Sequence, residues 1–128
     1  MKGKITSVLF ISTLLFGFTL SAIPNRRAIQ PGGTAVYNLL LQAQGGFADT
    51  VQLTVSNPSP DLLVSLDADQ AVPPAQVALT ITDIHVAPIP VGLFYTIPIT
   101  ATSGDLIQGI NIYLLVGGRQ VYLPLAYK

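Results

Sequence analysis

Short stretches in which apolar and polar residues alternate recur along this sequence, and they restrict its fold more than any other feature. In residues 50–56, for example, Val51, Leu53 and Val55 alternate with polar side chains. This period of two places the apolar side chains on one face of a β-strand and the polar ones on the other. After residue 24, no stretch keeps the spacing of an amphipathic helix for long. The sequence therefore predicts an all-β protein.

Turn-forming residues (Gly, Pro, Asn, Asp and Ser) separate these stretches and divide the chain into predicted strands. One buried and one exposed face is typical of antiparallel sheets, and about seven such strands in a chain of this length favour a β-sandwich. A single closed barrel is the alternative. The predicted strands are residues 26–30, 34–43, 50–56, 62–67, 76–82, 91–104 and 106–117.

Pro98 interrupts the strand predicted at residues 91–104. In that strand Ile97 and Ile99 point inward, so that Pro98 points outward together with Phe94. Proline has no N–H for the ladder and is tolerated in a strand only at a sheet edge or at a bulge. We therefore expect either one free flank at Pro98 or a local break in the ladder. The length and apolar character of the strand favour the break, a β-bulge.

The N-terminus has the pattern of an export signal. Two lysines precede an almost wholly apolar stretch, residues 5–20, which gives way to small residues. This pattern predicts a secretory signal peptide over residues 1–22, folded as a helix and cut after Ser21 or Ala22. The protein is then secreted or held at the cell surface. The alternative is an uncleaved membrane anchor, which the two arginines that follow disfavour.

Composition argues against several kinds of function. The chain has no cysteine, which removes thiol chemistry, disulfides and Cys-type zinc sites. It has no basic stripe, so we expect no nucleic-acid partner. His85 is the only histidine and is interpreted as an exposed loop residue, so we predict no enzyme activity. Asp61, Asp67 and Asp69 are interpreted as turn residues rather than a calcium site, and we expect neither metal nor cofactor.

Residues 90–104 resemble the penultimate strand of bacterial immunoglobulin-like modules, in particular those of the NEW3 (alpha-galactosidase-associated) type. That family has a proline, a glycine, an aromatic residue and alternating Thr and Ile there, ending in Ala-Thr-Ser-Gly. Residues 30–56 are similar to the first half of the family, so the similarity covers about residues 26–116. The matching residues of the strand are Pro90, Gly92, Tyr95, Ile97, Ile99, Ala101, Thr102, Ser103 and Gly104.

The resemblance implies an immunoglobulin-like antiparallel β-sandwich over residues 26–117, with Gly92, Tyr95 and Pro98 as structural residues. Tyr95 would be the tyrosine-corner residue, whose hydroxyl bonds to nearby backbone. In that family the module accompanies catalytic or surface domains, which implies a non-catalytic exported structural, assembly or adhesion module. The alternative is a carbohydrate- or peptide-binding accessory module. Phe94 is then the best candidate for an exposed contact with a protein or glycan at the cell surface.

The last residues, 118–128, are similar to the VYLPL tails of exported proteins from some filamentous bacteria (Chloroflexi type). Val121, Leu123 and Leu125 alternate with Tyr122, Pro124 and Ala126, as in an edge strand guarded by Pro124. The tail therefore forms one more edge strand or is recognised in trans by strand addition to another protein. In the second case Tyr122, Leu123, Pro124 and Leu125 would contact the partner.

Overall fold

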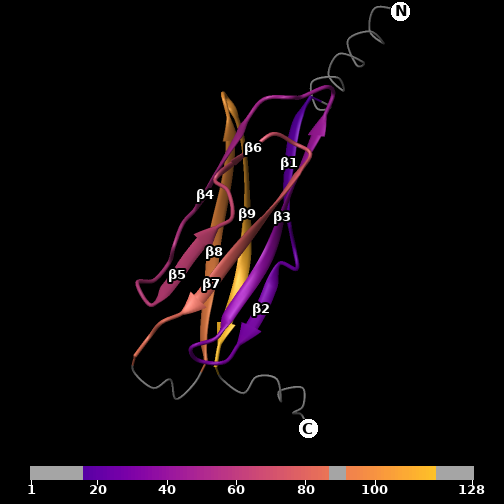
Figure 1. Ribbon diagram of the computed structural model, residues 1–128. Helices are drawn as coiled ribbons and strands as arrows, with labels where there is room; N and C mark the ends of the chain where they lie inside the picture. Colours follow the sequence, from indigo (N-terminus) through magenta and orange to yellow (C-terminus); the bar gives the residue numbers. More distant parts are fainter. Residues whose placement is uncertain (1–15, 87–91, 118–128) are drawn as a thin grey trace, which may run out of the picture.

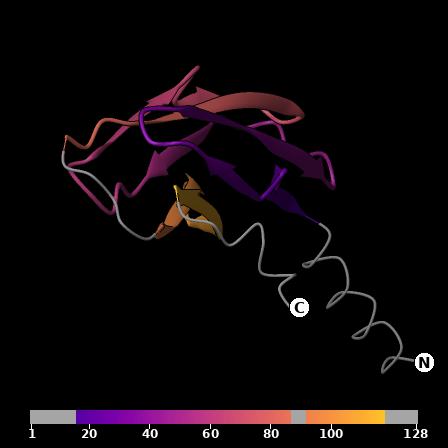
Figure 2. The same ribbon diagram turned by 90° about the horizontal axis from the view of Figure 1, so that it is seen from below.

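Two β-sheets pack face to face in the computed structural model, which describes residues 16–86 and 92–117 (Figure 1). The nine strands of these ranges are β1 (Gly17–Ile23), β2 (Arg26–Ile29), β3 (Thr34–Gln44), β4 (Val51–Val55), β5 (Leu62–Leu66), β6 (Gln70–Ala71), β7 (Ala75–Asp83), β8 (Leu93–Ser103) and β9 (Leu106–Val116). The four-stranded sheet has the order β1-β3-β7-β5, and the five-stranded sheet has the order β2-β9-β8-β4-β6. Figure 2 shows the two layers end-on, with the orange and yellow strands β8 and β9 in one of them.

This strand order is that of an immunoglobulin-like sandwich, as the sequence predicts. Seven strands coincide with predicted ones to within a few residues, while β1 and the two-residue β6 are additional. One pairing differs from the antiparallel prediction, because β2 runs parallel to β9. The chain leaves the four-stranded sheet after β1 and joins the other sheet as β2 without reversing its direction, so the two strands flank the sandwich on one side.

The alternating apolar residues form a single core between the sheets. As predicted for β8, Ile97, Ile99 and Ala101 are fully buried, whereas Phe94 is 63% exposed. Tyr95 is half-buried and packs against the core. Each fully buried aliphatic or aromatic side chain stabilises the fold by about 1.5–3 kcal/mol, so the inner faces dominate stability. The largest fully buried side chains are those of Tyr37, Leu39, Leu41, Val51, Leu79, Ile81, Ile97, Ile99, Ile112, Leu114 and Val116.

Pro98 lies at the last rung of the ladder between β8 and β4, and the predicted bulge is wrong. Strands β8 and β9 pair residue for residue along their whole length, with Pro98 opposite Asn111. On the other flank, the Ser56 N–H donates to the Pro98 carbonyl at 2.9 Å, one residue beyond the end of β4. The N and C=O of a strand residue point to the same side, so the N–H that proline lacks would also have faced β4. The missing donor therefore costs one bond where that pairing ends.

Strand β1 occupies the end of the predicted leader, and the prediction of a helix is wrong for its residues. All seven residues of β1 pair with β3. Phe18 and Leu20 point into the core and are buried, and the Phe18 ring lies 5.5 Å from that of Phe47. The described residues contain no helix, and so none that is long and apolar enough to cross a membrane. Residues 1–15 and the tail 118–128 lie outside the described residues.

We predict that the chain folds stably only with β1 present. A chain that begins at Ile23 loses the burial of Phe18 and Leu20 and bares the backbone edge of β3. Its melting temperature should lie many degrees below that of a chain beginning at Phe16, since each lost side chain costs about 1.5–3 kcal/mol. Calorimetry of the two chains measures the difference.

Point substitutions in β1 measure the contribution of its buried side chains without shortening the chain. Leu20→Ala should lower the free energy of unfolding by about 2–5 kcal/mol. Ser21→Ala, at the neighbouring exposed position, should change it by less than about 0.5 kcal/mol. Equal melting temperatures for the chains that begin at Phe16 and Ile23 would instead mean that the domain starts at the predicted boundary.

Candidate functional site

Three strands bring an arginine and two aromatic side chains together on the outer face of the five-stranded sheet. Arg26 comes from β2, Tyr113 from β9 and Phe94 from β8, which are neighbours in that order. In the register Arg26 lies opposite Tyr113, while Phe94 lies opposite Leu115, two residues further along β9. Because side chains alternate along a strand, these residues share one face. We call Arg26, Phe94 and Tyr113 the aromatic–arginine platform.

The platform side chains contact one another in a defined geometry. The rings of Phe94 and Tyr113 stack with their centroids 5.9 Å apart and their planes 15° from parallel. The Arg26 guanidinium carbon lies 5.3 Å from the centroid of the Tyr113 ring, within the range of a cation–π contact. Tyr113 is thus held between the two others, while Phe94 keeps most of its ring surface in water. The site offers an exposed aromatic ring and, across the ring of Tyr113, a positive charge.

An open hollow of about 310 Å³ lies over the platform. This volume is at the lower end of the range of small-molecule sites. Arg27 is fixed at its margin, because its Nε–H donates to the carbonyl of Val36 at 3.1 Å. The residues that line the hollow are Arg26, Arg27, Ala28, Phe94, Tyr113 and Leu115.

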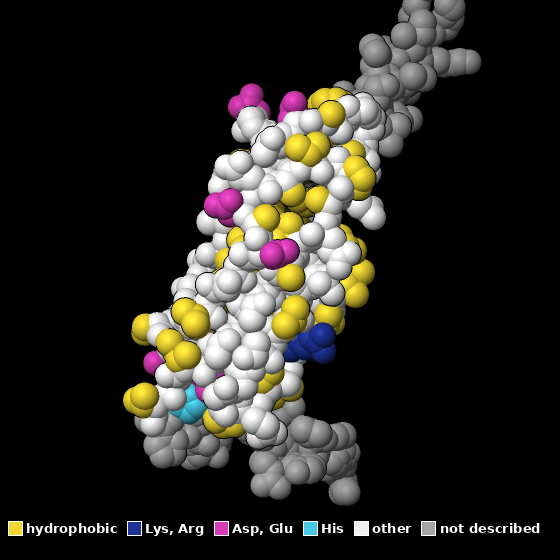
Figure 3. Space-filling view, viewed as in Figure 1, with side chains coloured by type: hydrophobic (Ala, Val, Ile, Leu, Met, Phe, Trp, Pro, Cys, Tyr) yellow, Lys and Arg dark blue, Asp and Glu magenta, His cyan; other side chains and the backbone are white. Residues whose placement is uncertain are grey.

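The hollow carries the positive charge of the described part of the chain. Arg26 and Arg27 are the only lysine or arginine residues in the described ranges. Within those ranges the one ion pair joins Asp83 and His85, so neither guanidinium is neutralised by a described carboxylate. On the face seen in Figure 3, the carboxylates are scattered from the upper end to the lower left, while basic side chains show only at the right edge. An anion would therefore be attracted to this hollow.

A buried tyrosine supports the platform from beneath. The Tyr37 hydroxyl, which β3 projects across the core, donates to the backbone carbonyl of Tyr113 at 2.7 Å. Burial raises the pKa of Tyr37 from 10.0 to about 12, against the opposing effect of the positive charge of Arg27. The hydroxyl therefore stays protonated and remains a donor. This bond joins the two sheets at the strand that carries the platform's central ring.

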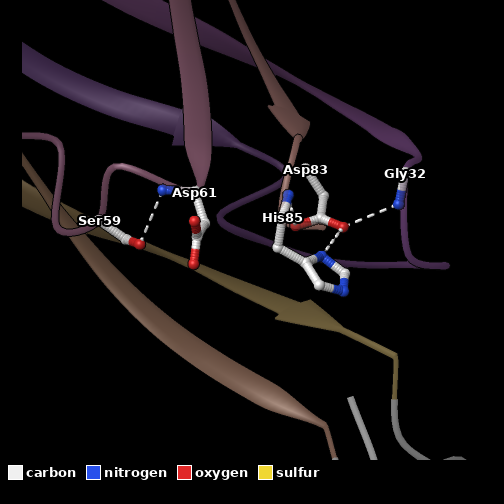
Figure 4. Close-up of polar contacts among 5 residues, drawn as sticks. All are labelled: Gly32, Ser59, Asp61, Asp83 and His85. Carbon is white, nitrogen blue, oxygen red and sulfur yellow. Dashed lines mark hydrogen bonds and ion pairs between the residues drawn. The ribbon is translucent and has the colours of Figure 1, made fainter. Parts of the chain in front are cut away.

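A second polar cluster lies at the end of β7 (Figure 4). The buried carboxylate of Asp83 accepts the backbone N–H of Gly32 at 2.8 Å and lies 2.5 Å from Nδ1 of His85. The Asp83 N–H donates to the carbonyl of Gly33 at 3.0 Å. Two bonds thus fasten the turn between β2 and β3 to the end of β7. The cluster holds a turn whose Gly32 adopts a positive φ of 82°.

His85 differs from the prediction of an exposed loop residue. Its side chain is only 10% exposed because it packs against Asp83. The Ser59 hydroxyl, drawn in the same view, accepts the backbone N–H of Asp61 instead of bonding to the imidazole. The contacts of Asp83 thus tie His85 to the turn that contains Gly32.

The remaining residues predicted to be structural or to contact a ligand lie partly inside and partly outside the described ranges. Gly92 directly precedes β8 and is half-buried. The hydroxyl that bonds to backbone across the described core is that of Tyr37, and the predicted corner bond of Tyr95 stays a prediction. Tyr122, Leu123, Pro124 and Leu125 lie outside the described residues. Within the described ranges, no three His, Cys, Asp or Glu side chains lie close enough together to hold a metal ion, and this includes the three aspartates predicted as turn residues.

The sequence does not reveal the contacts of the platform or of Tyr37 beneath it. It shows Arg26 only as a charge that follows the leader, because the place of Arg26 opposite Tyr113 depends on the parallel pairing of β2 with β9. The position of Tyr37 on an inward face was visible from alternation, but its acceptor on β9 lies 76 residues away along the chain. Phe94 was predicted to be exposed, and it is. Its stacking partner is fixed only by the register of β8 and β9.

The fold resembles domains of known bacterial surface proteins. Domains 4 and 5 of the S-layer protein SbsC align at 15% identity with a TM-score of 0.57, over 77% of this chain and 50% of that chain. A chain of the CsuC–CsuE chaperone–tip adhesion subunit complex from Csu pili of Acinetobacter baumannii aligns at 17% identity with a TM-score of 0.53, over 79% of this chain and 57% of that chain. No protein-family model and no curated protein matches the sequence. At these identities the likeness shows the fold, and the chain spans about half the length of the S-layer fragment.

We expect Tyr37→Phe to lower the free energy of unfolding by about 1 kcal/mol at neutral pH, because the Tyr113 carbonyl loses its donor. The difference from the wild type should shrink as the pH rises from about 10 to about 12. The unfolded tyrosine ionises near 10.0, whereas the folded one keeps its proton up to about 12, so the wild type alone loses this stabilisation.

Denaturant unfolding at a series of pH values measures both effects. Tyr113→Phe is the matched control, since it removes an outward hydroxyl and keeps the accepting carbonyl, and its effect should stay below about 0.5 kcal/mol. A Tyr37→Phe difference that does not change with alkaline pH would contradict the assigned proton.

We also expect Asp83→Ala to destabilise the domain by about 1–3 kcal/mol, because Gly32 N–H and the imidazole of His85 lose a buried partner. The amide of Gly32 should exchange its hydrogen faster in the variant, as measured by NMR. The exposed Asp49 provides the matched control, and Asp49→Ala should have little effect on either quantity. Unchanged exchange at Gly32 in Asp83→Ala would rule out the fastening role.

Proposed function

We propose that this chain is a non-catalytic exported module with a structural or adhesion role at the cell surface. The observation that carries the proposal is the likeness of this immunoglobulin-like sandwich to domains of an S-layer protein and to a chain of a pilus tip complex. The leader-like N-terminus supports export. The pairing of His85 with a carboxylate that fastens a turn supports a non-catalytic role. The residues matched in β8 support a relation to NEW3-type modules.

We further propose that the exported form keeps β1. Cleavage after Ser21 or Ala22 would remove Phe18 and Leu20 from the core and open one edge of the four-stranded sheet. An exposed, unpaired edge is prone to aggregation, which a released domain must avoid. The leader then either ends upstream of Gly17 or stays attached as an anchor.

A second candidate function is binding of a carbohydrate or peptide by an accessory module. The platform favours it, because a 63% exposed phenylalanine stacks on Tyr113, and the guanidinium over the Tyr113 ring pairs with no described carboxylate. Both functions place the module outside the cell, and they differ in whether the outer face of the five-stranded sheet contacts a soluble ligand.

Expression of the full chain in a bacterial host tests export and processing together. Protease added to intact cells should degrade the protein, and a chain that lacks residues 1–15 should stay protected inside. The intact mass of the exported protein should include residues 17–23. Protection of the full chain in intact cells would contradict the surface role, and a mass that starts at residue 22 or 23 would contradict retention of β1.

A further inference from the structure

We propose that the aromatic–arginine platform binds a polysaccharide that carries uronic acids. The inference rests on the second candidate function and names the ligand that the platform fits. Its starting point is the combination of an exposed ring, a guanidinium over the neighbouring ring and the absence of a described carboxylate pairing with either arginine of the hollow.

The three side chains of the platform project from the outer face of the sheet, over β2, β9 and β8, which pair in that order. A peptide that binds by strand addition would instead pair with backbone N–H and C=O groups at an edge of the sheet. A ligand that lies on the outer face is recognised by side chains, through flat apolar contact and charge.

A polysaccharide that carries uronic acids presents those two features along its chain. The C–H face of a pyranose ring is apolar and gains stability when it leaves water against an aromatic ring such as that of Phe94. The carboxylate of the sugar is planar and matches the forked N–H donors of a guanidinium, here those of Arg26. A guanidinium that lies over a ring keeps its in-plane N–H donors free for such a bond.

The surface beyond the platform is polar and suits the hydroxyls of further sugars. Thr96 lies opposite Tyr113, and Asn111 lies opposite Pro98, all on the outer face of the same two strands. Thr96 and Asn111 are exposed and offer one hydroxyl and one amide. A lipid or an apolar protein partner would leave these groups without hydrogen bonds, whereas a polysaccharide would satisfy them.

Affinity electrophoresis of the full chain tests the proposal with named probes. Polygalacturonate, alginate and hyaluronate are the acidic polysaccharides, and galactan and dextran are the neutral ones. We expect at least one acidic polysaccharide to retard the protein and both neutral ones to leave its mobility unchanged. High salt should weaken the retardation, because it screens the carboxylate–guanidinium attraction.

Substitutions then locate the binding. Arg26→Gln and Phe94→Ala should each weaken the interaction by about tenfold or more, the scale expected for loss of a principal contact. Ile107→Ala is the matched control, since Ile107 is 67% exposed and lies opposite Thr102 at the other end of the same face. It should bind like the wild type, and all three variants should keep the wild-type melting temperature.

Each other outcome overturns the inference in a distinguishable way. Retention of full affinity in both Arg26→Gln and Phe94→Ala would place the glycan site elsewhere and leave the accessory-module function intact. Binding of poly-aspartate, with no binding of the three acidic polysaccharides, would identify an acidic peptide as the ligand. Failure of every probe, together with surface exposure of the full chain on intact cells, would remove the ligand site and leave the structural role.

Discussion

The packing of two apolar sheet faces against each other is the interaction on which this domain depends. The chain has no cysteine, so no disulfide joins the layers, as it does in many exported domains of this size. The strands β3, β7, β8 and β9 supply most of the fully buried side chains. The bond from Tyr37 to the Tyr113 carbonyl adds a directional link across that core. Apolar burial sets the stability, and this bond helps to set the alignment.

The outer surface follows from the inner one. Ile112 and Leu114 are buried, so Tyr113 between them must point outward. The same alternation places Phe94 outside while Ile97 and Ile99 point in. The strand order β2-β9-β8 then brings Arg26 beside the two rings. The platform therefore needs no special backbone geometry: ordinary sheet pairing displays three suitable side chains in a row, above a core that holds their strands in place.

Sequence reasoning succeeded where a local pattern determines the structure. Alternation predicted most of the strands, the inward residues of β8 and the exposure of Phe94. It could do so because successive side chains of a strand point to opposite faces of the sheet. Prediction from the sequence failed where contacts with distant parts of the chain determine the structure. Such contacts end the pairing of β4 beside Pro98 and place β2 parallel to β9. They also bury the carboxylate that His85 contacts. Only β6, with two residues, was too short to leave a signal.

Strand β1 shows a different limit, in which one segment satisfies two patterns. An apolar stretch that ends in small residues suits a leader, and the same stretch alternates well enough for Phe18 and Leu20 to face a core. Hydropathy alone does not separate these readings, because both require apolar residues. The structure pairs this stretch with β3 and buries Phe18 and Leu20, and a chain without the stretch would lose the stability that this burial contributes. The boundary of the domain is thus a property of the packed sheet and not of the local sequence.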